Sequence, residues 1–369
     1  MISEAVFSET VLQLLAPIRP FLDDPSVSEV MINGPALIYV ERRGQLERTE
    51  ARFEDGEALQ AALRNIAQYV GKHLDEQRPI LEGRLPDGSR IEAVLPPAAP
   101  GGPHVSIRRF FKETLTVERL VGFGALTPLA AEVLRTLVRA KLNTLVAGGT
   151  GSGKTSLLNA LSSFIPDSER VVVIEDSQEL QLQRGHVVQL EARPPDAKGR
   201  GQVSVRDLFR ASLRMRPDRI VVGEIRGGEA LDLIQAMTSG HGGCLSTLHA
   251  TFPRDTLTRL ETMAMMSDTQ IPLHALRVQV ASAVDIVVQT TRLADGSRKV
   301  SHVSEVLEFS QAEGAYVLSD IFLRKHRRDD SGRLVDELEV CGMSEQLRSR
   351  LRDHGFTLPA TFDAQRGAA

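Results

Sequence analysis

The sequence has few of the cysteines that are typical of disulfide-stabilised or zinc-binding proteins. It has no tryptophan among 369 residues, aromatic side chains make up 4%, and only two cysteines occur, Cys244 and Cys341. Because these cysteines form no C-x-x-C pair, neither a disulfide framework nor a cysteine-built zinc site is supported. A reducing compartment such as the cytosol suits this cysteine usage.

Long hydrophobic runs and an excess of one charge are also missing. No apolar run approaches the roughly 18 to 20 residues that span a bilayer, and the first residues, with Glu4 and Glu9, do not form a secretory signal. Lysine and arginine total 44 against 48 acidic residues, a net charge of −4. This balance lacks the excess of positive charge that is typical of a protein that wraps nucleic acid. We therefore expect a cytoplasmic protein, peripheral to any membrane, with no nucleic-acid partner.

What the sequence does contain is one phosphate-binding loop. Residues 147–155 read Ala-Gly-Gly-Thr-Gly-Ser-Gly-Lys-Thr, which fits G-x-x-x-x-G-K-[S/T]. Its glycines let the backbone approach phosphate oxygens, Lys154 is placed to meet the β- and γ-phosphates, and Thr155 is placed to ligate Mg²⁺. An apolar run over 143–147 and helical spacing after the loop put the anion on a helix N-terminus. The loop residues expected to bind nucleotide are Gly148, Gly149, Thr150, Gly151, Ser152, Gly153, Lys154, Thr155 and Ser156.

The pattern around this loop predicts an α/β protein of two domains. Residues 1–112 mix short helices with strands separated by turns, which is typical of an α+β domain with a mostly antiparallel sheet. Residues 113–127 have little periodicity and form the candidate linker. From 128 to 310 helices and strands alternate, which predicts βαβ units and a mainly parallel sheet. Residues 311–369 are predicted to be a partly helical tail, without an assigned role.

One carboxylate stands where a hydrolytic site needs it. A buried strand is predicted over 219–222, and Gly223 then takes the place of the usual Walker B aspartate. Glu224 is therefore the only carboxylate at that strand end that can orient an attacking water.

A second predicted strand, 171–174, ends at another pair of acidic residues. Asp176 and Glu179 have capping-box spacing, which favours a helix start. Glu175 is harder to explain by capping, and its carboxylate can hold Mg²⁺ through water. Both interpretations stay open.

Histidines and arginines complete the candidate site. His241 and His249 bracket a predicted strand and lack partners at metal-ligand spacing, so zinc is not expected. A histidine beside a nucleotide can donate to phosphate or relay its presence to the next subunit. In the first domain Arg90 and Arg108 lie on predicted strands, and spacing alone assigns them no role.

Together these motifs resemble the secretion-superfamily ATPases of type II and type IV secretion and of type IV pili. The resemblance is closest to the CpaF/TadA-type ATPases of tight-adherence (Flp) pilus systems, and it covers about Asp24 to about Thr290. The stretches that carry it are 85–90, 105–110, the phosphate loop, 174–176, 213–227 and 240–250.

The resemblance implies a hexameric ring in which each subunit joins an N-terminal α+β domain to a RecA-like domain, with ATP and Mg²⁺ between them. It implies that Arg90 and Arg108 reach the γ-phosphate. The residues assigned to catalysis are Glu224, Lys154, Glu175, Arg90 and Arg108. The nucleotide site also takes in His241, His249 and Arg226, and Mg²⁺ is assigned to Thr155 and, through water, to Glu175.

We expect a motor in which ATP hydrolysis moves one domain against the other and drives pilus assembly or protein secretion through inner-membrane platform proteins. One alternative is the ATPase of a conjugation-type type IV secretion system or a nucleic-acid translocase. Another is a nucleotide-gated scaffold with negligible turnover. Pilus extension versus retraction, the secreted substrate, and whether the arginines act within a subunit or across to its neighbour stay open.

Overall fold

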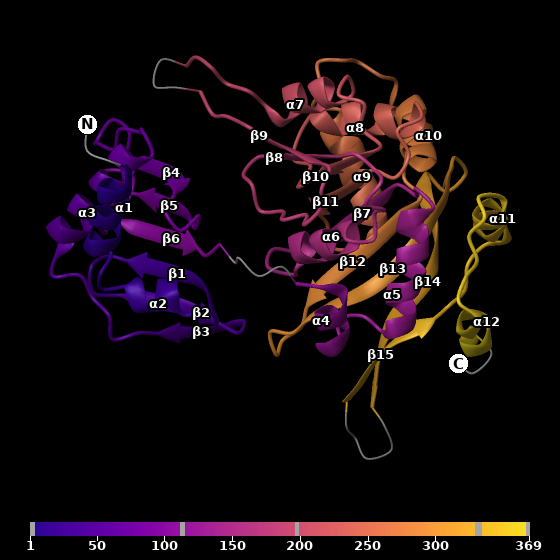
Figure 1. The fold of residues 1–369 in the computed structure, drawn as a ribbon, viewed down its shortest axis with the longest axis horizontal. Coiled ribbons are helices and arrows are strands. Elements are labelled where there is room, and N and C mark those ends of the chain that lie inside the picture. Colours follow the sequence, from indigo (N-terminus) through magenta and orange to yellow (C-terminus); the bar gives the residue numbers. More distant parts are fainter. Residues whose placement is uncertain (1–3, 111–114, 196–198, 329–333, 367–369) are drawn as a thin grey trace. The chain divides into compact units, whose positions relative to one another are not determined.

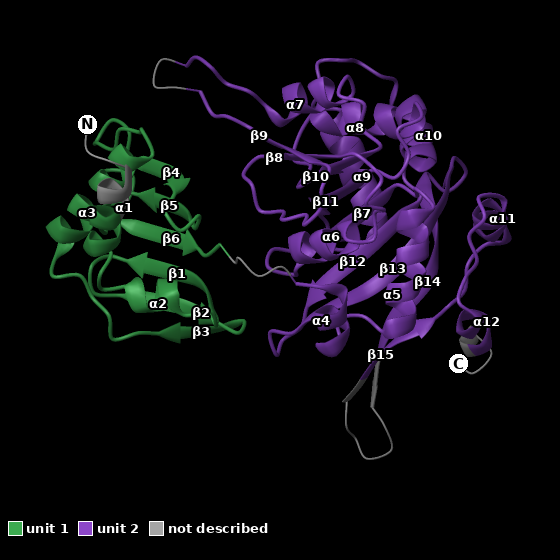
Figure 2. Cartoon of the chain, in the orientation of Figure 1, with its two compact units in different colours: residues 1–113 green, residues 114–369 purple. Residues whose placement is uncertain are grey.

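A computed structural model describes residues 4–110, 115–195, 199–328 and 334–366 (Figure 1). The chain divides into two compact units, residues 1–113 and 114–369, each built around one sheet (Figure 2). Among the residues described, no helix combines the length and the apolar character that crossing a bilayer requires.

Unit 1 is a six-stranded antiparallel sheet in the order β3-β2-β1-β6-β5-β4. Inward-facing Val30, Ile91 and Ile107 pack in one core with the apolar stripe of helix α3, including Leu63 and Ile66. One buried face and one wetter face explain the alternating strand patterns. The elements of unit 1 are α1 (Glu4–Leu14), α2 (Arg19–Asp23), β1 (Val27–Asn33), β2 (Ile38–Arg42), β3 (Gln45–Arg48), α3 (Gly56–Tyr69), β4 (Ile80–Arg84), β5 (Arg90–Val94) and β6 (His104–Arg108).

Unit 2 is a nine-stranded mixed sheet in the order β15-β14-β13-β12-β7-β11-β10-β8-β9. Strands β12 to β9 pair in parallel, and β13 to β15 add antiparallel neighbours at the other side. The predicted α/β class, with one antiparallel and one mostly parallel sheet, is confirmed. The strands are β7 (Thr144–Gly148), β8 (Val171–Glu175), β9 (Val187–Glu191), β10 (Arg219–Val222), β11 (Leu245–His249), β12 (Ile286–Arg292), β13 (Arg298–Ser310), β14 (Ala315–Arg328) and β15 (Leu334–Val340).

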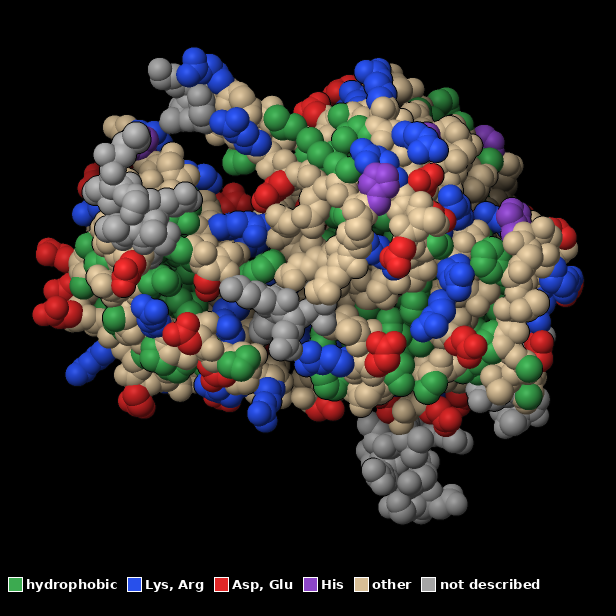
Figure 3. Space-filling model, in the orientation of Figure 1, with side chains coloured by type: hydrophobic (Ala, Val, Ile, Leu, Met, Phe, Trp, Pro, Cys, Tyr) green, Lys and Arg blue, Asp and Glu red, His purple; other side chains and the backbone are tan. Residues whose placement is uncertain are grey.

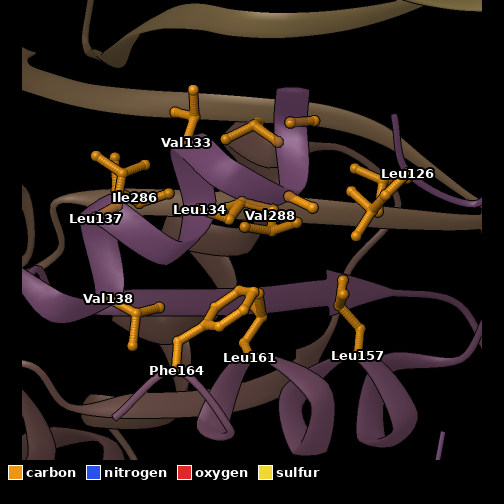
Figure 4. Packing of buried hydrophobic residues seen from close by; sticks show 14 of the residues in the cluster. Leu126, Val133, Leu134, Leu137, Val138, Leu157, Leu161, Phe164, Ile286 and Val288 are labelled. Atoms are coloured by element: carbon orange, nitrogen blue, oxygen red, sulfur yellow. The ribbon is translucent and has the colours of Figure 1, made fainter. Parts of the chain in front are cut away.

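Helices cover both faces of this sheet, so its central strands read as continuous apolar runs. Figure 4 shows side chains of α5 facing β12 on one face, together with Leu157, Leu161 and Phe164 from α6 and the turn after it. Leu145 and Ile174 belong to the core on the other face, under α7 to α10. The helices are α4 (Val117–Gly122), α5 (Pro128–Arg139), α6 (Lys154–Ser162), α7 (Val205–Ser212), α8 (Glu229–Thr238), α9 (Pro253–Ala264), α10 (Leu273–Ala283), α11 (Glu345–Asp353) and α12 (Ala360–Arg366).

Residues 113 and 114 of the predicted linker over 113–127 lie outside the described residues, and the rest differs from the prediction. Residues from 117 to 122 form helix α4, and Val117, Leu120 and Leu126 are buried in the core of unit 2. The Thr116 side chain caps this helix by accepting from the backbone N–H of Arg119. Six residues are too few to show helical periodicity, which is why the sequence pattern missed the helix.

In the predicted tail over 311–369 the described residues include the expected helices but also two strands, and residues 329–333 and 367–369 lie outside the described part. Strands β14 and β15 extend the sheet of unit 2, and α11 and α12 pack back onto it. Phe362 of α12 is 0% exposed and meets Phe322 of β14 edge-to-face, with ring centroids 5.7 Å apart. Within β14, Arg324 pairs with Asp336 of β15 at 3.0 Å. The Arg324 and Asp336 charges are thus paired across neighbouring strands of the sheet.

Candidate nucleotide-binding site

The glycine loop lies at the carboxyl end of β7 and leads directly into α6. Gly151 and Gly153 have φ of 69° and 93°, a region that favours glycine. A Cβ at Gly148 would collide with the Thr290 hydroxyl, so only glycine fits there. The first N–H groups of α6 have no partner within their own helix and point to the loop side, which makes the loop a fit for a polyphosphate.

Lys154 is the buried cation of this loop. Its side chain is 7% exposed, and its Nζ donates to the Gly149 carbonyl at 2.9 Å. The same Nζ lies 3.3 Å from Nδ1 of His249, at the end of β11. The ammonium is therefore already held at the loop, among groups that a phosphate would replace.

A chain of charged contacts leads away from Lys154 across the strand ends. His249 Nε2 lies 2.9 Å from Oε1 of Glu224. Arg226 donates to the other oxygen of Glu224 at 2.8 Å and to Asp176 at 3.3 Å. Burial, together with the positive charge of Lys154, lowers the pKa of His249 against the opposing pull of Glu224. A neutral ring that accepts from Lys154 and donates to Glu224 satisfies both contacts.

Glu175 closes β8 as a buried carboxylate, 4% exposed. Its Oε1 accepts from the backbone N–H groups of Glu179 and Leu180, each at 2.9 Å. Burial raises the pKa of Glu175 to about 7, against the lowering effect of these hydrogen bonds. The described residues 176–186 form no helix. The capping-box interpretation of Asp176 and Glu179 was therefore wrong, because Glu175 itself organises this turn.

The missing Walker B aspartate has a steric explanation. A Cβ at Gly223 would lie 2.9 Å from Cγ and 3.3 Å from Oε1 of Glu175. The Gly223 carbonyl also accepts from the Thr247 hydroxyl at 2.6 Å. The space an aspartate would need is thus taken by a carboxylate from the neighbouring strand.

A pocket of about 340 Å³ opens beside this chain of contacts, lined by Glu224, Ile225, Arg226, His249 and Arg259. Its volume lies in the range of small-ligand sites. Within the part of the chain that the structure describes, no cluster of three His, Cys, Asp or Glu is arranged to hold a metal. A Mg²⁺ bound by the Thr155 hydroxyl, phosphates and water needs no such cluster.

One predicted residue, His241, lies away from this centre within unit 2, and two others, Arg90 and Arg108, belong to unit 1. His241 precedes β11, whereas the glycine loop follows β7, its parallel neighbour, so the length of β11, about 17 Å, separates them within one chain. Arg90 and Arg108 lie in unit 1, directly opposite one another on β5 and β6. Arg90 lies 3.9 Å from Glu82.

Two arginines beside the loop were missed by the sequence analysis. Arg292 ends β12 and Arg298 begins β13, and Nε of Arg298 donates to the Gly151 carbonyl at 2.9 Å. Thr290 of β12 donates to the Ala147 carbonyl at 3.0 Å. The sequence gives no local motif for these residues, because they reach the loop only through the parallel pairing of β12 with β7.

The glycine loop and the strand order around it define an α/β protein of the P-loop NTPase class. The family described as "Type II/IV secretion system protein" matches residues 12–341. The chain therefore belongs to this family of secretion ATPases.

Relatives and solved structures agree with this assignment. The type IV secretion system protein PtlH of Bordetella pertussis is 36% identical over 311 residues, covering 77% of this chain and 91% of that protein. VirB11 of Brucella suis is 35% identical over 320 residues, covering 79% and 88%. The pilus retraction motor PilT, solved with bound ADP, shares the fold with a TM-score of 0.53 at 18% identity, covering 95% and 86% of the two chains.

Proposed function

We propose that this protein is an ATP hydrolase that drives a type IV secretion machine. The observation that carries the proposal is the Glu224 carboxylate at the end of β10, held between His249 and Arg226 and linked through His249 to Lys154 of the glycine loop. Family membership supports the use of ATP and Mg²⁺.

The arrangement couples phosphate binding to the general base. Lys154 leaves the Gly149 carbonyl and His249 when it turns toward the phosphates. His249 then keeps Glu224 oriented through Nε2 while Glu224 accepts a hydrogen bond from the attacking water. Thr155, and Glu175 through water, would hold Mg²⁺, which would supply neutralising charge to the phosphates.

Further charge and the mechanical output come from outside this site. We assign Arg90 and Arg108 of unit 1 to the γ-phosphate, within a subunit or across to its neighbour. A homo-hexamer that meets inner-membrane platform proteins on the cytoplasmic side fits the family, and the motion of unit 1 against unit 2 is the step that would do work on them. His241 is left as a candidate contact for a neighbouring subunit.

The relatives favour conjugation-type secretion over a tight-adherence pilus. PtlH and VirB11 are named as type IV secretion proteins. A pilus motor stays a second candidate, because the PilT pilus retraction motor has the same fold. Direct nucleic-acid pumping is disfavoured, since basic and acidic side chains are interspersed on the face that Figure 3 shows.

Substitution of the proposed base tests the proposal. In Glu224→Gln we expect kcat for ATP to fall by roughly 10³-fold, while the Kd for ADP stays within about threefold. Glu132→Gln, at an exposed position on α5, is the matched control and should leave both values unchanged. Undiminished turnover in Glu224→Gln contradicts the mechanism, and a wild-type protein that binds ATP without turnover supports the scaffold alternative.

A further inference from the structure

The strands on the two sides of β7 end level with the glycine loop. His249 of β11 and Thr290 of β12 both stand opposite Gly148 of β7 in parallel register. Beyond β11 lie the carboxylates of Glu224 and Glu175, at the ends of β10 and β8. The loop is therefore flanked by hydrolytic groups on the β11 side and by the β12–β13 hairpin on the other.

The hairpin turns two arginines onto the loop. Arg292 and Arg298 are direct cross-strand partners at its mouth. Besides the contact of Arg298 with the Gly151 carbonyl, a Cβ at Gly151 would lie 3.2 Å from Nη1 of Arg292, and a Cβ at Gly153 would lie 3.4 Å from Cδ of Arg298. Both side chains pack against the backbone that wraps the phosphates.

Like charges placed directly opposite each other in a sheet destabilise it. A bound anion relieves this repulsion, and arginine is suited to phosphate because its planar donors grip two oxygens at once. The hairpin pair is thus a cationic clamp attached to the rim of the glycine loop.

The order of strands decides which phosphate the clamp meets. The terminal phosphate has to face Glu224, the base for its attack, on the β11 side. The rest of the nucleotide then leaves the loop on the opposite side, toward β12 and the hairpin. We propose that Arg292 and Arg298 bind the α-phosphate, at the nucleoside end of the ligand, and set affinity for nucleotide. This inference rests on the proposed ATPase function and assigns part of the same site.

Calorimetric titration with ADP and with the non-hydrolysable analogue AMP-PNP tests the clamp. For Arg292→Ala and Arg298→Ala we expect the Kd of both ligands to rise by the same factor, about tenfold for each lost charged hydrogen bond. KM for ATP should rise in step, with kcat at saturation unchanged. Arg298→Lys should restore part of the affinity. The matched control is Arg139→Ala, an exposed arginine at the end of α5.

Each other result overturns the clamp. Loss of AMP-PNP affinity alone would place the arginines at the γ-phosphate. Affinities equal to those of Arg139→Ala would show no contact with the ligand. A lowered Tm, with affinity not recovered by Arg298→Lys, would make the pair a structural support of the loop. If the wild-type protein binds neither ligand, the ATPase proposal itself is overturned. This outcome differs from failure of the clamp alone, in which the wild-type protein still binds both ligands.

Discussion

Each sheet of this protein includes a pair of arginines directly opposite one another, and in unit 1 a third, Arg84 of β4, lies opposite Arg90 on its other side. In unit 1 the pair is Arg90 and Arg108, on β5 and β6, and in unit 2 it is Arg292 and Arg298, on β12 and β13. In the second pair, Arg298 donates to the Gly151 carbonyl of the glycine loop. The first pair belongs to a separate compact unit.

The arginine pair of unit 1 has acidic neighbours in its own sheet. Arg90 lies 3.9 Å from Glu82, and Arg108 stands opposite Glu29 of β1 and lowers the pKa of that carboxyl, against the larger raising effect of burial. Carboxylates of its own sheet thus partly balance the unit 1 pair. A pair that packs on the loop is suited to hold ligand, whereas the unit 1 pair, which we propose to reach the nucleotide by domain motion, is suited to stabilise charge that develops during turnover.

The largest effect is expected from removing an arginine of unit 1. Arg108→Ala should lower kcat by roughly 10³-fold, because the arginine that we propose for the γ-phosphate would act in the transition state. The Kd for ADP should hardly change. Steady-state turnover and calorimetry measure both, and Arg48→Ala on the exposed edge strand β3 is the control. An Arg108→Ala variant that loses ADP affinity and keeps kcat would erase the contrast between the two pairs.

The contrast between the two arginine pairs also requires that the carboxylates on the other side of the loop, Glu224 and Glu175, be held in place by packing within unit 2. Gly223→Ala should destabilise that unit by about 2 kcal/mol, because the new Cβ overpacks against Glu175. Chemical denaturation of the single and double variants checks the cause. In a Glu175→Ala background most of the cost of Gly223→Ala should disappear. Additive effects in that cycle would show that the two residues do not compete for space.

These residues show how far the sequence reaches. The glycine loop, Glu224 and the two-sheet architecture can be predicted from local sequence motifs and from the alternation of strands and helices. The steric conflict between Gly223 and Glu175 does not, because it depends on the register between β10 and β8. Likewise Arg292 and Arg298 stand more than a hundred residues from the loop, and parallel pairing alone brings them to it.

The segments that the sequence analysis did not predict, α4, β14 and β15, were missed for the same physical reason. Helix α4 is six residues long and buries Val117 and Leu120, and strands β14 and β15 intersperse charged residues with apolar ones, so none of the three has a clear local pattern. Their place is decided by tertiary packing, as for Leu120 in the core of unit 2. Propensity and pattern carry little weight where packing contributes most of the stability.

Protonation of Glu175 should have a smaller effect, on the pH dependence of the free energy of unfolding. Its folded-state pKa of about 7 lies above the ordinary 4.5, so the folded protein binds this proton more tightly than the unfolded chain does. Its contribution to stability is complete below the ordinary value and is lost as the pH rises through about 7. Between about pH 8 and about pH 6 the free energy of unfolding should gain about 1 kcal/mol from this group. Glu175→Gln should lack that gain in denaturation curves at the two pH values, and an unchanged pH dependence would contradict the raised pKa.

The finest test concerns which charge governs His249. Burial and Lys154 lower the pKa of its imidazole, and Glu224 raises it. Imidazole NMR titration should therefore show a pKa below the ordinary 6.5 in the wild type, a higher pKa in Lys154→Met and a lower one in Glu224→Gln. His302 on β13, whose pKa is lowered mainly by burial, serves as the internal control in the same spectra. Insensitivity of His249 to both substitutions would break the link from the glycine loop to Glu224, and with it the separation of a hydrolytic side from the arginine side.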